Sequence, residues 1–301
     1  MPLYHASEAR VTPRTPSGHF HNCVGPAVPF SKGNNTPNTP ANPKSGFVVK
    51  ELCFSYTQKT LFERLTVSIG RGEFCSVVGP NGAGKSTFIK LLARLLEPHA
   101  GRILFEEQLL SSYPRRELAQ RIAYVPQESY FALDFTVLET VLQGRHPYLK
   151  PLERYHSSDF ALARQAIDRL GISHLADKGI NNISSGERQL AVIARSLVQQ
   201  PSVIVLDEPL NHLDLSHQQQ VLFLLGELHS EGMSVVLVAH DLNQAALVSQ
   251  RMLVFAEGQL VEDGKPDDLL TPDLVQRYWG IRPIEGRHPE SNKRQIFLPL
   301  K

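Results

Sequence analysis

Cysteine is scarce in this sequence, whose 301 residues include only Cys23, Cys53 and Cys75. No two of them form a Cys-x-x-Cys pair, so the simplest interpretation is a reduced, cytosolic compartment. Long apolar runs are lacking too: no stretch reaches about 18 apolar residues, and we expect no membrane span. The N-terminus has no apolar segment of the kind found in secretory signal peptides, so none is expected.

Excess charge of either sign is also absent. The sequence has 31 Lys and Arg against 30 Asp and Glu, which gives a formal net charge of +1. Without a basic surplus, we expect no nucleic-acid partner. The 42% of hydrophobic and 20% of charged residues are enough for a substantial core in one large or two ordinary domains.

Residues 1–46 differ in composition from the rest of the chain. They hold eight of the 21 prolines and much Ser, Thr, Asn and Gly, and Glu8 is their one acidic residue. Such a segment cannot bury enough surface to offset the entropy lost on ordering, so we predict a disordered, proline-rich tail. Within it, HFHNC places His19, His21 and Cys23 in alternation, and a metal site there is the alternative interpretation.

From Phe47 onward the sequence has the patterning of a folded α/β domain. The runs FVVKELCFSY and LTVSI predict strands, and GRILFEEQLL and LVFAEGQLVEDG predict hairpins. GEFCSVVG predicts a buried strand. SVIVLDEP and MSVVLVAH are continuous apolar runs flanked by helical segments, as a parallel sheet covered on both faces requires. A mostly helical stretch is predicted from Val137 to Gly179, with loop signals at QGRHPYLKP.

A glycine-rich loop, GPNGAGKS from Gly79 to Ser86, follows one of these strands and opens a helix predicted over Ser86 to Leu96. In such a loop, backbone N–H groups surround phosphate oxygens at a helix N-terminus, where the dipole favours anions. Lys85 then reaches the β- and γ-phosphates, and Ser86 supplies a ligand to Mg²⁺. The alternative is an ordinary glycine turn, which the strand–loop–helix context disfavours.

Two carboxylates end the apolar strand VIVLDE. In a nucleotide site of this kind, Asp207 holds Mg²⁺, usually through water. Glu208 points differently and is placed to polarise a water that attacks the γ-phosphate. VAHD then puts His240 at the same edge of the sheet, where the active sites of open α/β sheets gather. The alternatives are an ordinary acidic strand end and a buried structural histidine.

The stretch ISSGERQLAVIARS begins a helix. Ser184 and Glu187 have the spacing of a capping box, and apolar residues then recur at helical spacing until Pro201. Taken alone, the stretch is a well-capped amphipathic helix. A helix that begins Ser-Ser-Gly also offers free N–H groups and hydroxyls to an anion.

In this order, the motifs resemble those of the ATP-binding cassette family, the nucleotide-binding subunits of ABC transporters, from about Phe47 to the C-terminus. The resemblance implies an ATPase with ATP and Mg²⁺ as cofactors. By the same resemblance, Tyr56 in CFSY stacks on adenine, Gln127 in YVPQE contacts Mg²⁺ and the attacking water, and LNHLD is a D-loop ending at Asp214. Two cassettes of the family face head to tail, so that ISSGERQ of one covers the γ-phosphate held by the other.

Sequence and resemblance together give three sets of candidate site residues. The candidate catalytic residues are Glu208, His240 and Gln127. The candidate Mg²⁺ ligands are Ser86, Gln127 and Asp207. The candidate nucleotide-binding residues are Tyr56, Gly79, Pro80, Asn81, Gly82, Ala83, Gly84, Lys85, Ser86, Thr87, Ser184, Ser185, Gly186, Glu187 and Asp214.

Two positions depart from the family pattern. Ser185 stands where the family commonly has Gly. The serine adds a Cβ and a hydroxyl near the phosphate, so we expect a slight change in how the two cassettes close on ATP. Leu210 stands where a Thr or similar residue usually follows Asp-Glu-Pro, near the dimer seam. Neither departure removes a charged catalytic group.

The resemblance implies an α/β fold: a P-loop NTPase core with a mostly parallel sheet, an N-terminal antiparallel β subdomain and a helical signature subdomain. We expect the ABC ATPase domain at residues 47–280, with its helical subdomain at about 128–186. A C-terminal extension is expected at 281–301, with a final strand at QIFLPL.

Within the family, DEPLNHLDLSHQ, AHDLNQA, GRHPYL and the C-terminal stretch look most like the cassettes of importers for iron–siderophore, haem and cobalamin. That resemblance implies a homodimer of cassettes at the cytoplasmic face of the inner membrane, bound to integral membrane permease subunits. An extracytoplasmic substrate-binding protein would be an indirect partner. A molybdate or tungstate importer is the alternative. A soluble ABC protein acting on ribosomes or DNA is disfavoured by the single cassette, and a P-loop kinase has no place for ISSGERQ.

Overall fold

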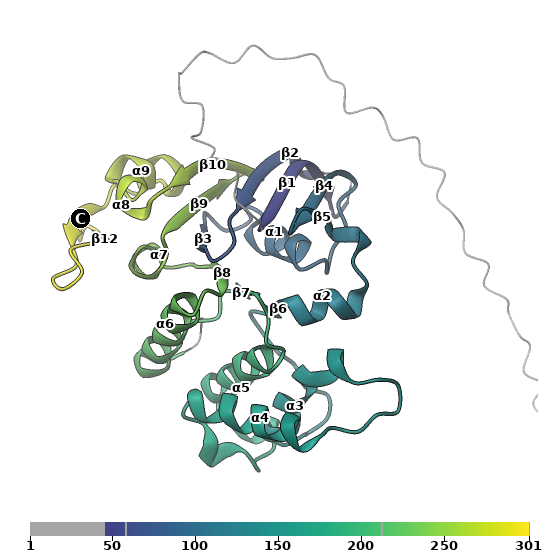
Figure 1. Ribbon diagram of the computed structural model, residues 1–301. Helices are drawn as coiled ribbons and strands as arrows, with labels where there is room; N and C mark the ends of the chain where they lie inside the picture. Colours follow the sequence, from purple (N-terminus) through teal and green to yellow (C-terminus); the bar gives the residue numbers. More distant parts are fainter. Residues whose placement is uncertain (1–45, 58, 212, 301) are drawn as a thin grey trace, which may run out of the picture. The chain divides into compact units, whose positions relative to one another are not determined.

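The structure, a computed structural model, describes residues 46–57, 59–211 and 213–300 (Figure 1). Apart from Gly46, the predicted tail lies outside the described residues, and so does the alternative metal site at His19, His21 and Cys23. The described residues begin with strands, continue with alternating strands and helices, and end in a β-hairpin.

A four-stranded antiparallel sheet contains the first strands of the chain. Its order is β2 (Thr60–Ile69), β1 (Phe47–Ser55), β4 (Ala100–Phe105) and β5 (Gln108–Leu109). Buried and exposed residues alternate along β1, but the alternation shifts by one position between Val49 and Leu52. Glu51 lies there with a φ of 49°, and the register with β2 is irregular, as a β-bulge requires. The predicted antiparallel β subdomain is confirmed.

A six-stranded, mostly parallel sheet forms the second layer. Its order is β10 (Gln259–Gly264), β9 (Arg251–Ala256), β3 (Phe74–Val78), β8 (Ser234–Val238), β7 (Val203–Asp207) and β6 (Ile122–Val125). Five strands pair in parallel, and β10 pairs with β9 as an antiparallel edge hairpin. The prediction of a mostly parallel sheet is confirmed.

Both faces of this sheet are buried, which explains the continuous apolar runs in the sequence. In β7, Ile204 and Leu206 belong to one hydrophobic cluster, whereas Val203 and Val205 belong to another. Successive side chains of a strand point to opposite faces, so every position of the strand must be apolar when both faces are covered. Only Asp207, the last residue of β7, is charged.

Nine α-helices accompany the strands in the described part of the chain. They are α1 (Lys85–Leu92), α2 (Arg115–Arg121), α3 (Val137–Leu142), α4 (Ser157–Arg169), α5 (Ser185–Val198), α6 (Leu215–Ser230), α7 (Leu242–Val248), α8 (Pro266–Leu269) and α9 (Pro272–Trp279). Four short 3₁₀ helices occur at Leu110–Ser112, Gln143–Tyr148, Ser173–Leu175 and Ile180–Asn182. Helices α3, α4 and α5 pack on one another (Figure 1). The helix predicted over Ser86 to Leu96 is shorter than expected, because α1 ends at Leu92.

The stretch QGRHPYLKP was expected to be a loop, but its first part is a 3₁₀ helix. The reason is the buried side chain of Arg145, which donates to Asp159 Oδ1 at 2.8 Å and to the backbone carbonyl of Val198 at 3.0 Å. Its guanidinium also lies over the Tyr148 ring, 3.7 Å from the centroid. These contacts tie the turn to α4 and α5, and pattern reasoning from Gly and Pro alone does not reveal them.

The C-terminal residues form a separate two-stranded antiparallel hairpin, β11 (Ile284–Arg287) and β12 (Arg294–Phe297). The final strand predicted at QIFLPL is therefore present, but it ends at Phe297. This hairpin contacts α7.

Candidate functional site

The glycine-rich loop connects β3 to α1, the strand–loop–helix context that the sequence predicted. Gly79 has a φ of 152°, and a Cβ there would lie 2.0 Å from the carbonyl oxygen of Phe255. Gly84 has a φ of 99°, and a Cβ there would lie 2.7 Å from the Phe62 ring. Both positions therefore require glycine, because the loop runs directly against a strand backbone and an aromatic ring.

Lys85 is the first residue of α1 and is buried. Its Nζ donates to the carbonyl oxygens of Gly79 at 2.9 Å and Pro80 at 3.1 Å, so the ammonium lies within the loop that it closes. Burial lowers the pKa of Lys85, while the nearby carboxylates of Glu208 and Asp207 act to raise it. The loop thus presents a positive charge beside two negative ones.

Ser86 and Asp207 meet although 121 residues separate them in the sequence. Ser86 Oγ donates to Asp207 Oδ1 at 2.7 Å, and Tyr124 Oη donates to Asp207 Oδ2 at 3.2 Å. Burial, together with the Asp207 charge, raises the pKa of Tyr124, so its hydroxyl remains a donor. One carboxylate and one hydroxyl fit the protein share of a Mg²⁺ site, because Mg²⁺ takes few protein ligands and completes its shell with phosphates and water.

Glu208 follows directly but has a left-handed backbone, with a φ of 47°. Its Oε2 accepts hydrogen bonds from Gln127 Nε2 at 3.0 Å and from Asn211 Nδ2 at 2.5 Å. Gln127 and Glu208, two of the candidate catalytic residues, are therefore in contact. Sequence reasoning missed Asn211 and Tyr124 as partners of the two carboxylates. Asn211 lies inside the LNHLD stretch, which was a usable signal.

A pocket of about 340 Å³ contains the loop residues. It is lined by Tyr56, Leu61, Asn81, Gly82, Gly84, Lys85, Ser86, Thr87 and Glu208. Tyr56 is 61% exposed, and its hydroxyl lies 3.1 Å from Thr87 Oγ1. An exposed aromatic ring tethered at its hydroxyl is suited to stacking on a planar base.

His240 follows β8 and is exposed rather than buried. It lines a smaller pocket together with Glu208, Leu210, Gln218 and Gln244. The interpretation as a buried structural histidine is therefore wrong. Leu210, which departs from the family pattern, lines this same pocket, and its side chain is buried.

Ser184 caps α5 as the sequence predicted. Its hydroxyl accepts from Glu187 N at 3.2 Å, and its own N–H donates to Glu187 Oε2 at 2.8 Å, which completes the capping box. These hydrogen bonds lower the pKa of Glu187. Asp214 caps α6 by accepting from His217 N at 2.8 Å. Neither Ser184 nor Asp214 lines the pocket that contains Lys85 within this chain.

Gly186 lies where α5 begins and is buried against the start of α6. A Cβ on this glycine would lie 3.3 Å from His217 Nδ1 and 3.5 Å from a Leu213 methyl. The start of α5 is therefore packed against the segment that follows Glu208. Ser184 and Ser185 remain exposed at the same helix end.

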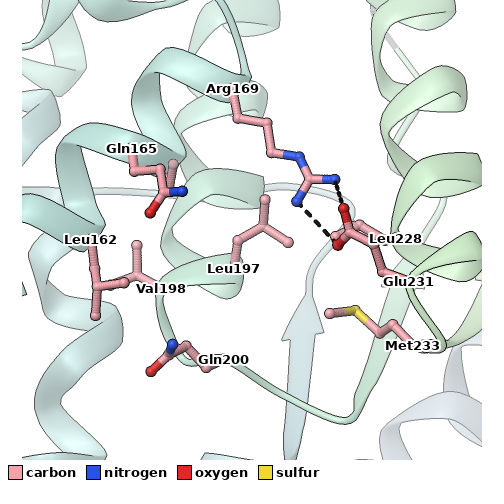
Figure 2. A pocket seen from close by; sticks show the side chains of 10 residues that line it. Leu162, Gln165, Arg169, Leu197, Val198, Gln200, Leu228, Glu231 and Met233 are labelled. Carbon is pink, nitrogen blue, oxygen red and sulfur yellow. Dashed lines mark hydrogen bonds and ion pairs between the residues drawn. The ribbon is translucent and has the colours of Figure 1, made fainter.

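A further pocket, of about 260 Å³, lies between α4, α5 and α6 (Figure 2). Arg169 of α4 lines the pocket and donates to Glu231 at 2.7 Å. It also donates to Glu227 at 3.3 Å. Most of its other lining residues are apolar, among them Leu162, Leu197 and Met233. No candidate site residue lines this pocket, so it is distinct from the phosphate loop.

The fold and the loop together define a P-loop ATPase of the cassette class. Comparison with known proteins then gives its family. The sequence model of the ABC transporter family matches residues 62–211. The ferric enterobactin transport ATP-binding protein FepC of Escherichia coli K12 is 38% identical over 234 residues, which cover 77% of this chain and 86% of that protein. The chain belongs to the ABC transporter family and is one of its ATP-hydrolysing cassettes, for which ATP and Mg²⁺ are the cofactors.

Two further similarities point the same way. The petrobactin import ATP-binding protein FpuD of Bacillus anthracis is 38% identical over 180 residues, which cover 60% of this chain and 66% of that protein. A solved chain of a metal-chelate type ABC transporter in an inward-facing conformation is 30% identical, with a TM-score of 0.74. That alignment covers 85% of this chain and 98% of the solved chain. Among the described helices, none is long and apolar enough to cross a membrane.

Proposed function

We propose that this chain is the ATPase subunit of an importer for a metal chelate, such as an iron–siderophore complex, haem or cobalamin. The observation that carries the proposal is the 38% identity to a ferric enterobactin transport ATPase across 86% of its length. The chain would act at the cytoplasmic face of the inner membrane as a homodimer bound to permease subunits. An extracytoplasmic substrate-binding protein would deliver the chelate to the permease.

Reconstituted transport tests this proposal. The chain and the permease encoded beside it would be placed in vesicles, and uptake of ferric siderophores, haem, cobalamin and molybdate would be compared in the presence of ATP. We expect ATP-dependent uptake of a chelate. Uptake of molybdate or tungstate alone would favour the alternative, and the absence of uptake with every substrate would contradict an importer.

In the proposed hydrolysis, the residues around the loop have separate roles. Glu208 accepts a proton from the water that attacks the γ-phosphate, and Gln127, which contacts its carboxylate, orients that water. Lys85 pairs with the β- and γ-phosphates, and Tyr56 stacks on adenine. Ser86, Asp207 and Gln127 would hold Mg²⁺, which neutralises phosphate charge when bound. His240, at the same sheet edge, would act on the γ-phosphate from the side of β8.

We propose further that each nucleotide is shared between two copies of the chain. The start of α5, with Ser184 and Ser185, would cover the γ-phosphate in the loop of the partner, and Asp214 would lie at the same interface. The exposed hydroxyls and the first-turn N–H groups at the start of α5 suit an anion. The capping hydrogen bond of Ser184 is compatible with this role, because Ser185 and the backbone donors remain available.

Lys85→Ala is expected to weaken ATP binding by about 10- to 100-fold, because it removes charge-assisted hydrogen bonds worth about 1.5–3 kcal/mol in total. The reference is Lys90→Ala, since Lys90 lies in the last turn of the same helix. Equilibrium binding of a fluorescent ATP analogue measures both variants. Wild-type affinity in Lys85→Ala would place the phosphates outside this loop.

We also propose the domain limits given above, with the ABC ATPase domain at 47–280, its helical subdomain at about 128–186 and an extension at 281–301. Every candidate site residue lies after residue 46. Deleting residues 1–46 is therefore expected to leave the ATPase rate within about twofold of the full chain. The purified truncation would be assayed for ATP turnover and thermal unfolding. Loss of most activity, or failure to fold, would contradict the N-terminal boundary.

A further inference from the structure

The helix that follows His240 is too short to hold its own position. Helix α7 spans seven residues, Leu242–Val248, and helices of this length are unstable in isolation. Its placement therefore depends on contacts with other elements. In the described part of the chain, no hydrogen bond of the His240 ring is found. His240 is joined directly to Asp241, which caps α7 by accepting from Asn243 N at 2.8 Å and from Gln244 N at 3.2 Å.

The C-terminal hairpin is hydrogen-bonded to the first turn of α7 through Asn243. Asn243 Nδ2 donates to the carbonyl oxygen of Ile296 at 2.9 Å, and Ile296 N donates to Asn243 Oδ1 at 2.8 Å. One side-chain amide thus satisfies both backbone groups of a strand residue, as a neighbouring strand would. Removing that amide leaves a partly buried N–H and C=O without these partners.

The same hairpin is hydrogen-bonded to the last turn of α7 through Lys293. Lys293 Nζ donates to the carbonyl oxygens of Ala246 at 3.2 Å and Leu247 at 2.5 Å. Free carbonyls at a helix C-terminus attract a cation, so this contact caps the helix. Lys293 and Ile296 lie three residues apart and hold opposite ends of α7, which means that β12 runs along the helix in the reverse direction.

The hairpin is itself anchored to the domain. Arg294 N donates to Asp267 Oδ1 of α8 at 2.9 Å, and Ile296 packs against the main hydrophobic cluster. On the other side of α7, Gln244 Nε2 donates to Gln218 Oε1 of α6 at 3.0 Å. The first turn of α7 is therefore clamped between the hairpin and α6.

We propose that the hairpin β11–β12 positions His240 for ATP hydrolysis by clamping α7 through Asn243 and Lys293. Asn243 is a positioning residue, because its amide is engaged with Ile296 and acts on the reaction only through α7. The proposal rests on the role proposed above for His240, which lines one pocket with Glu208. In this proposal, the C-terminal extension supports ATP hydrolysis by placing the histidine of its own subunit.

The test is a double-mutant cycle on the full-length chain. Asn243→Ala is expected to lower kcat on the order of tenfold and to leave KM for ATP within about twofold, because the phosphate loop is untouched. Asn243→Asp keeps the acceptor for Ile296 N–H, so its kcat should lie between those of the wild type and Asn243→Ala. In a His240→Ala background, Asn243→Ala should change kcat by less than about twofold, since the group that it positions is gone. The matched control is Gln276→Ala, which removes an amide-to-backbone hydrogen bond on α9.

Hydrogen exchange of the amides of α7 provides a readout that does not need turnover. Asn243→Ala should speed exchange in residues 242–248, whereas Gln276→Ala should not. The inference is wrong if α7 keeps its protection in Asn243→Ala, or if Asn243→Ala lowers kcat by the same factor with and without His240. A His240→Ala variant that turns over ATP at the wild-type rate would instead overturn the role proposed for His240.

Discussion

Glu208→Gln is expected to lower the ATP turnover number by about 10²- to 10⁴-fold while ATP remains bound. A glutamine amide cannot accept the proton of the attacking water. It can, however, keep the local structure, because its oxygen can take the place of Oε2 and still accept from Gln127 and Asn211. An ATP-loaded dimer should accumulate. Turnover assays, nucleotide binding and gel filtration with ATP measure the three effects.

The matched control is Glu107→Gln. Glu107 is also a glutamate with a left-handed backbone, at a φ of 67°, and it is exposed at the turn between β4 and β5. The same change of charge is thus made away from the phosphate loop, and activity should stay within about twofold. A wild-type turnover number in Glu208→Gln, measured with the permease present, would mean that another group accepts the proton.

The residues around Glu208 illustrate what the sequence could and could not predict. The glycine loop, Asp207 and Glu208 were predictable because they lie at the ends of strands whose apolar runs are unambiguous, and parallel strands end at one sheet edge. Tyr124 and Asn211 were missed because their roles consist of single hydrogen bonds to those carboxylates. Such bonds depend on side-chain directions, which the pattern of apolar and polar residues does not encode.

The C-terminal extension shows the same limit over a longer distance. The resemblance to importer cassettes predicted a final strand at QIFLPL, and a strand is present. That this strand runs along α7, with Asn243 bonded to Ile296 across 53 residues, depends on the packing of the intervening helices α8 and α9. Asn243 lies in AHDLNQA and Lys293 in the C-terminal stretch, but both stretches were used only for the family resemblance, and nothing in them marked either residue as a partner of the other element.

Ser184→Arg is expected to lower ATP turnover by more than about 100-fold while leaving ATP binding to the loop nearly unchanged. Arginine would place a bulky cation at the N-terminus of α5, where the helix dipole disfavours it, and would remove the cap on Glu187 N. In the proposed dimer it would also obstruct the nucleotide of the partner. The control is Ser230→Arg, at the exposed end of α6, which should keep wild-type turnover.

Mixed dimers test whether Ser184 serves its own nucleotide or that of the partner. When one subunit carries Ser184→Arg and the other carries Lys85→Ala, a head-to-tail dimer has both lesions in one site and leaves the second site intact. When one subunit carries both changes and its partner is wild type, each site has one lesion. The first pairing should therefore retain more activity at equal ATP occupancy, measured with differently tagged subunits purified as heterodimers. Greater activity in the second pairing would mean that ISSGERQ acts on the nucleotide of its own subunit.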